Sequence, residues 1–228
     1  MLQKLKKNIL DLIFPPRCLN CNHLGKFICD NCLGKIIRIK EQGCPFCHKK
    51  TNGGRLCAAC RAKHELTGVV AYGYFHDPIL KKIIHQYKYE GISAAGEVIS
   101  LLLAQTIKST AINFDIITFA PVSKRRFNER GYNQAEILAK HLSEYFEKPL
   151  FRKISKIKHT PTQVGLKRKD RLRNLEGTIV VKDSDILKGR RVIIIDDVLT
   201  TGATLDECAR ALRQAGARQV WGVVLGKE

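Results

Sequence analysis

The sequence predicts an α/β fold, with a mostly parallel sheet flanked by helices and a small cysteine-rich module in front of it. After residue 66, short β-branched runs alternate with amphipathic helical patterns, which is typical of parallel sheets. The run Val192–Ile195 has the four β-branched residues expected of a strand buried on both faces. Eight of the nine cysteines lie within residues 18–60. We therefore expect two units, a module over residues 1–65 and an α/β domain over residues 66–228.

The hydrophobic pattern of the α/β domain places its strands and helices in alternation. Runs of β-branched and aromatic residues predict strands at 69–75, 114–119, 192–195 and 219–225. Apolar residues at helical spacing predict helices at 78–90, 94–108, 135–147 and 204–215. Pro78 stands at the first position of a helix, where its fixed φ suits a helix start, and Gly91 follows the end of that helix.

The chain carries a large positive charge. Its 40 lysines and arginines outnumber 21 acidic residues, and the formal net charge is +19. About half of this surplus falls in residues 123–174, which hold fifteen basic and five acidic residues. Such a field favours an anionic partner, either nucleic acid or a polyphosphate, although a solvated basic surface would give the same total.

Residues 1–14 combine lysines with a short apolar run that Asp11 interrupts. No small-residue cleavage site follows, so we expect a short amphipathic helix here rather than a signal peptide. The chain has no stretch of about 18 apolar residues, so no membrane span is expected. We therefore expect a cytoplasmic protein, in a compartment where thiols stay reduced.

Two carboxylates and a small, hydroxyl-rich turn follow the strand at 192–195. Backbone N–H groups and hydroxyls in such a turn can hold a phosphate, and the N-terminus of the following helix adds its dipole. Carboxylates only accept hydrogen bonds, so they suit the hydroxyls of a sugar rather than the phosphate. A buried strand that ends in two acids explains the carboxylates but not the turn. The pattern therefore predicts a site for ribose-5-phosphate, made of Asp196, Asp197, Thr200, Thr201, Gly202, Ala203 and Thr204.

This stretch resembles the phosphoribosyl-pyrophosphate (PRPP) motif of type I phosphoribosyltransferases. The resemblance implies a type I phosphoribosyltransferase-like fold that binds PRPP with Mg²⁺. Asp196 and Asp197, the catalytic candidates, would then hold the ribose hydroxyls directly or through Mg²⁺-bound water. By the same resemblance, Ser123, Lys124 and Arg125 after the strand at 114–119 are assigned to the pyrophosphate, with a solvated basic turn as the alternative.

The clustered cysteines form four Cys-x2-Cys pairs, and two such pairs complete a tetrahedral thiolate site for which Zn²⁺ is the default ion. Two structural zinc ions are expected, most simply bound by neighbouring pairs, although interleaved pairing stays open and an iron–sulfur cluster is a minor alternative. The module has too few large apolar residues for a core of its own, so metal must supply much of its folding free energy. The ligands are Cys18, Cys21, Cys29 and Cys32 for one ion, and Cys44, Cys47, Cys57 and Cys60 for the other.

Basic residues between the two phosphate candidates predict a nucleic-acid surface. Residues 156–174 are expected to form a mobile loop and a short basic helix, and such a loop can close over pyrophosphate or track a nucleic-acid backbone. Aromatic residues are sparse here, which favours backbone contacts over sequence readout. The residues assigned to nucleic acid are Arg126, Arg130, Lys156, Lys158, Lys167, Arg168, Lys169, Arg171 and Arg173.

Four short motifs behind the cysteine module make the whole chain similar to the ComF family of phosphoribosyltransferase-like competence proteins. They are Arg-x-x-Glu-Arg-Gly-Tyr-Asn-Gln at 126–134, His-Thr-Pro-x-Gln-x-x-Leu at 159–166, Arg-x-x-Asn at 171–174 and Asp-Asp-Val-x-Thr-Thr-Gly-Ala-Thr at 196–204. The resemblance implies DNA uptake in natural transformation, with single-stranded DNA and a helicase-type competence protein as partners. One departure, Phe119-Ala120 where the family often has Pro-Val, leaves the loop length unchanged.

These observations leave three functions open. The favoured one is a DNA-handling protein that binds PRPP or a related phosphoribosyl compound. The second is an active phosphoribosyltransferase, which would transfer ribose-5-phosphate from PRPP to an unknown acceptor. The third is a non-enzymatic regulator that senses PRPP.

Overall fold

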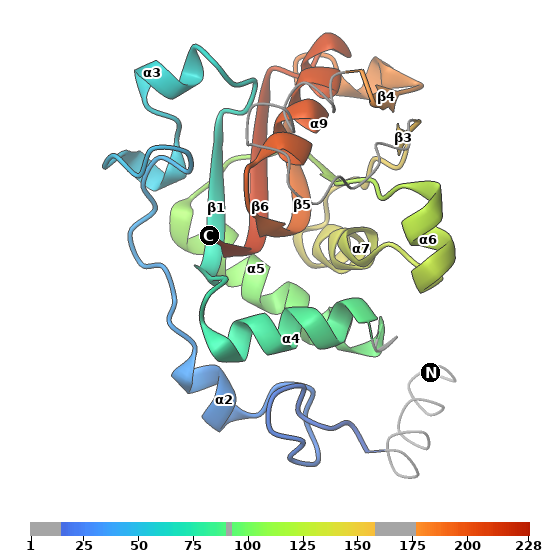
Figure 1. The fold of residues 1–228 in the computed structure, drawn as a ribbon. Coiled ribbons are helices and arrows are strands. Elements are labelled where there is room, and N and C mark those ends of the chain that lie inside the picture. Colours follow the sequence, from blue (N-terminus) through green and yellow to red (C-terminus); the bar gives the residue numbers. More distant parts are fainter. Residues whose placement is uncertain (1–14, 90–92, 158–176) are drawn as a thin grey trace.

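The computed structural model describes residues 15–89, 93–157 and 177–228, and within them it has the expected α/β architecture (Figure 1). Its central sheet is parallel, with strand order β1-β6-β5-β2. The helix expected at 1–14 and nearly all of the basic segment expected at 156–174 lie outside the described residues. The strands of the sheet are β1 Gly68–Tyr74, β2 Ile116–Phe119, β5 Arg191–Leu199 and β6 Gln219–Lys227.

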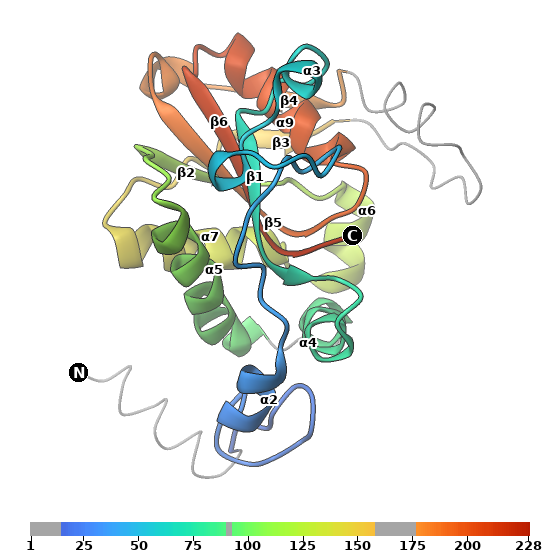
Figure 2. The same cartoon turned by 90° about the vertical axis from the view of Figure 1, so that its left-hand side faces the viewer.

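Helices cover both faces of the sheet. The helices α5 and α7 pack on one face, and α9 lies on the other with the antiparallel pair β3 Ile154–Lys156 and β4 Ile179–Val181 (Figure 2). Val192–Ile195 are fully buried, as expected of a strand covered on both faces. None of the helices in the described ranges has both the length and the apolar character that a membrane crossing requires. The helices are α4 Pro78–Tyr89, α5 Gly96–Thr110, α6 Lys124–Arg130, α7 Gln134–Phe146 and α9 Ala203–Gln214, with 3-10 turns η1 Asn52–Gly54, η2 Ser93–Ala95 and η3 Ser184–Leu187.

Three elements differ from the sequence expectation. The strand β5 continues to Leu199, so the two carboxylates lie within the strand rather than after it, because β6 also continues and Asp196 pairs with Val224. The helix α6 forms where a loop was expected, because the Ser123 hydroxyl accepts a hydrogen bond from the Arg126 N–H (3.4 Å) and caps the helix. The β3–β4 pair was not predicted, since three-residue strands carry too little pattern.

The cysteine module runs along the free edge of β1 and contains α2 Asp30–Lys35 and α3 Ala58–Arg61. The buried amide of Gln42 takes the place of a neighbouring strand. Its Nε2 donates to the carbonyl of Ala71 at 2.7 Å, and the Ala71 N–H donates to Oε1 at 3.2 Å. The Ile39 N–H donates to the Tyr72 carbonyl nearby. These bonds pair backbone groups that an edge strand would otherwise expose, and they fix the module to the sheet.

Candidate functional site

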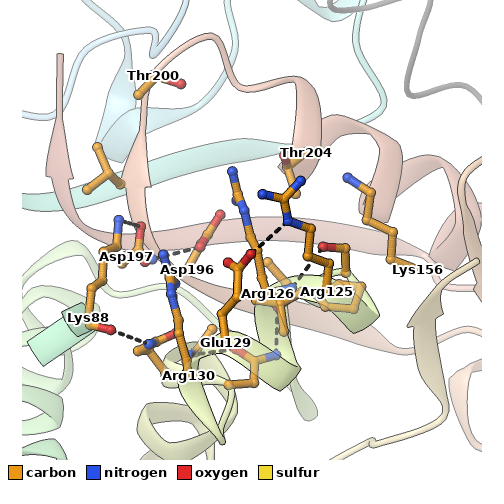
Figure 3. Close-up of a pocket in the computed structure, with 18 residues that line it drawn as sticks. Lys88, Arg125, Arg126, Glu129, Arg130, Lys156, Asp196, Asp197, Thr200 and Thr204 are labelled. Atoms are coloured by element: carbon orange, nitrogen blue, oxygen red, sulfur yellow. Dashed lines mark hydrogen bonds and ion pairs between the residues drawn. The ribbon is translucent and has the colours of Figure 1, made fainter. Parts of the chain in front are cut away.

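A cavity of about 490 Å³ opens at the carboxyl ends of β2 and β5, where parallel sheets usually bind ligands (Figure 3). Its walls come from the end of α4, the loop and helix after β2, the start of α7, the end of β3 and the β5–α9 connection. It therefore collects charged side chains from segments far apart in the sequence. These are Lys88, Arg125, Arg126, Glu129, Arg130, Lys156, Asp196 and Asp197.

The two carboxylates of β5 form one wall of the cavity. The Asp197 N–H donates to Asp196 Oδ1 at 2.8 Å. Burial raises the pKa of Asp196 to about 7, and the negative charge of Asp197 contributes to the rise. A carboxyl group with this pKa is about half protonated at neutral pH, so it can accept a hydrogen bond from a ligand hydroxyl or donate one to it.

Lys88 is a residue of this cavity that sequence reasoning did not assign. It lies in the last turn of α4, and its Nζ lies 2.8 Å from Asp197 Oδ1. Only 19% of the lysine side chain and 17% of the aspartate side chain are exposed. The ion pair balances the charge of one carboxylate beside the partly protonated Asp196. No local pattern marks Lys88, because its partner comes from a strand more than a hundred residues later.

Three arginines and a lysine give the cavity its basic character. Arg125, Arg126 and Arg130 come from α6, and Lys156 joins them from the end of β3 (Figure 3). Arg125 Nε donates to Glu129 Oε1 at 2.7 Å, so this guanidinium is partly neutralised. Burial lowers the pKa of Lys156, and the charge of Arg126 lowers it further. An anion bound among these groups would relieve that repulsion.

The structure brings the two predicted anion sites into one cavity. Arg126, Arg130 and Lys156, which were expected to bind nucleic acid, line it together with the carboxylates expected to bind a phosphoribosyl group. Ser123 and Arg125 also line it, whereas Lys124 does not. The other residues expected at nucleic acid lie outside the described part of the chain; they are Lys158, Lys167, Arg168, Lys169, Arg171 and Arg173.

The turn 200–204 surrounds a smaller hollow of about 40 Å³ beside the main cavity. Gly202 has φ +78°, in the left-handed region that favours glycine, and it forms the N-cap of α9. Thr200 and Thr204 also line the main cavity, so the two spaces adjoin. A phosphate in the turn would lie at the N-terminus of α9 while the rest of the ligand extended toward the carboxylates.

Eight of the nine cysteines form two groups of four, each built from neighbouring Cys-x2-Cys pairs as the simplest assignment expects. Within each group, all four sulfur atoms lie within 4.8 Å of one another. A tetrahedral ion with Zn–S bonds of about 2.3 Å requires S–S separations of about 3.8 Å, so both groups fit Zn²⁺. Separations of 3.6 Å for Cys21–Cys29 and 3.5 Å for Cys47–Cys57 are too long for disulfides. Both groups have every ligand position filled by protein, which is typical of structural zinc.

Known proteins match both parts of the chain. Residues 89–226 match the family model for the phosphoribosyl transferase domain, and residues 9–61 match the model for the double zinc ribbon domain. Competence protein F of Haemophilus influenzae is 29% identical over 221 residues, covering 86% of this chain and 96% of that protein. DNA utilization protein YhgH of Escherichia coli K12 is 30% identical over 229 residues, covering 92% and 97%. Competence protein ComFC of Bacillus subtilis is 27% identical over 196 residues, covering 83% and 79%.

Proposed function

Because this chain belongs to the phosphoribosyl transferase domain family, we propose that its cavity binds PRPP, or a related phosphoribosyl compound, together with Mg²⁺. The observation that carries the proposal is the division of charge within one cavity. Two adjacent carboxylates lie on β5, a small turn with a helix N-terminus adjoins them, and arginines and a lysine complete the lining. A ligand with a diol between two phosphate-bearing ends matches this arrangement.

Each part of such a ligand has a corresponding part of the cavity. The turn 200–204 would hold the 5′-phosphate through its backbone N–H groups and hydroxyls. Asp196 and Asp197 would hold the ribose hydroxyls directly or through Mg²⁺-bound water, and Mg²⁺ would add positive charge beside the pyrophosphate. Ser123 and Arg125 stay assigned to the pyrophosphate.

We further propose that the same cations bind single-stranded DNA. Arg126, Arg130 and Lys156 can contact phosphates of either ligand, so DNA and PRPP should compete for them. The names of the relatives, two competence proteins and a DNA utilization protein, support a role with DNA for this chain. A location in the cytoplasm stays a prediction. A helicase-type partner stays a prediction.

An active transferase is the alternative, and its acceptor would have to bind outside this cavity or at its rim. None of the described residues that line the cavity is aromatic, so no ring is available there to stack on a nucleobase. Release of pyrophosphate from PRPP by the purified protein would favour the transferase over a DNA-handling protein or a PRPP sensor.

Titration calorimetry with PRPP and Mg²⁺ tests the main proposal. The double variant Asp196→Asn/Asp197→Asn should bind PRPP about a hundredfold more weakly, since it loses two hydrogen bonds to charged groups. Asp185→Asn is the matched control, because this carboxylate is exposed and lies on η3. Unchanged affinity in the double variant would overturn the assignment of the carboxylates.

Competition and salt dependence test the DNA proposal. Excess PRPP should displace a labelled single-stranded oligonucleotide from the wild-type protein. For Arg126→Ala, the slope of log affinity against log salt should fall by about 0.7 for each phosphate contact that is lost. Simultaneous, independent binding of both ligands would contradict a shared set of cations.

A further inference from the structure

The loop that carries the first pair of cysteines of the second group touches the turn proposed to bind phosphate. Phe46 stands between the ligands Cys44 and Cys47, and its ring lies against Gly202. A Cβ built on Gly202 would lie 2.5 Å from Phe46 Cε1 and 3.0 Å from Cζ, so the ring approaches this glycine more closely than a side chain would permit. The zinc-ribbon module therefore forms the outer wall of the turn.

A second contact ties the same part of the module to the start of α9. The ring of Phe46 stacks on His64, with centroids 3.7 Å apart and an interplanar angle of 4°. His64 Nδ1 donates to Asp206 Oδ2 at 2.9 Å, and the Glu65 N–H donates to Asp206 Oδ1 at 2.8 Å. Asp206 lies in the first turn of α9, and its own N–H donates to the Gly202 carbonyl. The module thus contacts Gly202 in the turn 200–204 and Asp206 at the start of α9.

These contacts matter because a turn binds phosphate only when its N–H groups converge. The left-handed conformation of Gly202 sets the direction of the backbone in this turn, and it is one of several conformations that glycine can adopt. A neighbour that restricts glycine to this conformation reduces the ordering required when the ligand binds. Phe46 is placed to provide that restriction, and it is itself held between two cysteines of one metal site.

We propose that Phe46, supported by His64 and Asp206, is a positioning residue for the phosphate-binding turn, and that the second cysteine group thereby controls affinity for the phosphoribosyl ligand. The proposal rests on the function proposed above for the turn 200–204. It assigns the second cysteine group a role beyond folding of the module.

Two measurements test this proposal, namely hydrogen exchange of residues 199–206 in the ligand-free protein and the affinity for PRPP. Phe46→Ala should exchange faster than wild type across this segment and should bind PRPP about tenfold more weakly, the size expected for loss of an aromatic contact. Phe46→Tyr keeps the stacked ring and should restore both values. Asn20→Ala is the matched control, because Asn20 holds the same position between Cys18 and Cys21 in the first group.

The zinc content of each variant separates positioning from unfolding. Phe46→Ala should retain two zinc ions per chain, because all eight ligands remain. If it retains only one, Asp206→Asn tests the same link from the α9 side, and it should also speed exchange of residues 199–206. Exchange and PRPP affinity equal to wild type in both variants would overturn the proposal. Absence of PRPP binding in the wild type would defeat the proposed function, while the exchange experiment would still decide whether the module orders the turn.

Discussion

The two cysteine groups have the same ligands but contact different parts of the molecule. The first lies beside α4, as the position of α2 in Figure 1 shows, and Lys82 Nζ of α4 donates to the Asn20 carbonyl at 2.6 Å. The second lies against the turn that begins α9, where the Phe46 ring meets Gly202. The two groups also differ in the residue that precedes the second cysteine of their first Cys-x2-Cys pair. This residue is Asn20 in the first group and Phe46 in the second. The comparison teaches that the cysteine spacing specifies the local fold, whereas the residues between the cysteines determine what each ribbon touches.

Removal of one ligand from each group should give the largest contrast. Cys21→Ser and Cys47→Ser are matched, because both side chains are exposed. Each variant should bind one zinc ion per chain, and the affected ribbon should unfold, since a structural zinc site contributes roughly 10 kcal/mol to its module. Only Cys47→Ser should weaken PRPP binding, as measured by calorimetry beside zinc analysis. Equal losses of PRPP affinity in the two variants would remove the distinction between the ribbons.

The titration of Asp196 should be independent of the first ribbon. The pKa of Asp196 is about 7 in the folded protein, which is above the pKa of an aspartate in the unfolded chain. As pH rises from the unfolded pKa to 7, the unfolded chain loses this proton first, so the free energy of unfolding falls over that range. Asp196→Asn should therefore raise the free energy of unfolding by about 4 kcal/mol at pH 8 and leave it nearly unchanged near pH 4. Denaturation at both pH values, in wild-type and Cys21→Ser backgrounds, measures this difference. Equal stabilisation at pH 4 and pH 8 would show that Asp196 is not the titrating group.

The contact of the first ribbon with α4 should have the smallest effect. Lys82→Ala removes one exposed hydrogen bond to the Asn20 carbonyl, so the free energy of unfolding should fall by no more than about 1 kcal/mol. PRPP affinity should stay within twofold of wild type, because this contact lies on the side of α4 that carries the first ribbon. A large loss of PRPP affinity in Lys82→Ala would mean that the first ribbon also acts on the cavity.

The sequence predicted those features that depend on local pattern. Buried β-branched runs gave the strands of the sheet, Cys-x2-Cys spacing gave both cysteine groups, and the ordered motifs predicted the similarity to the ComF family, which the relatives confirm. The end of β5 was placed too early, because Asp196 and Asp197 interrupt its apolar run while its pairing with β6 continues through them to Leu199.

The features that were missed depend on contacts between distant segments. Lys88 reaches Asp197 only because α4 ends at the edge of the sheet where β5 also ends. Phe46 meets Gly202 only because the module follows the free edge of β1. His64, to which the sequence pattern assigned no role, is mostly buried between Phe46 and Asp206. Spacing along the chain carries no signal for such pairs.

Titration of the wild-type protein with PRPP and Mg²⁺, at two zinc ions per chain, tests the central claim most directly. The account predicts one PRPP bound per chain, with affinity that rises from pH 6 to pH 8 as Asp196 ionises. Absence of PRPP binding to the fully zinc-loaded protein would contradict it, and the cavity and the second ribbon would then require another ligand.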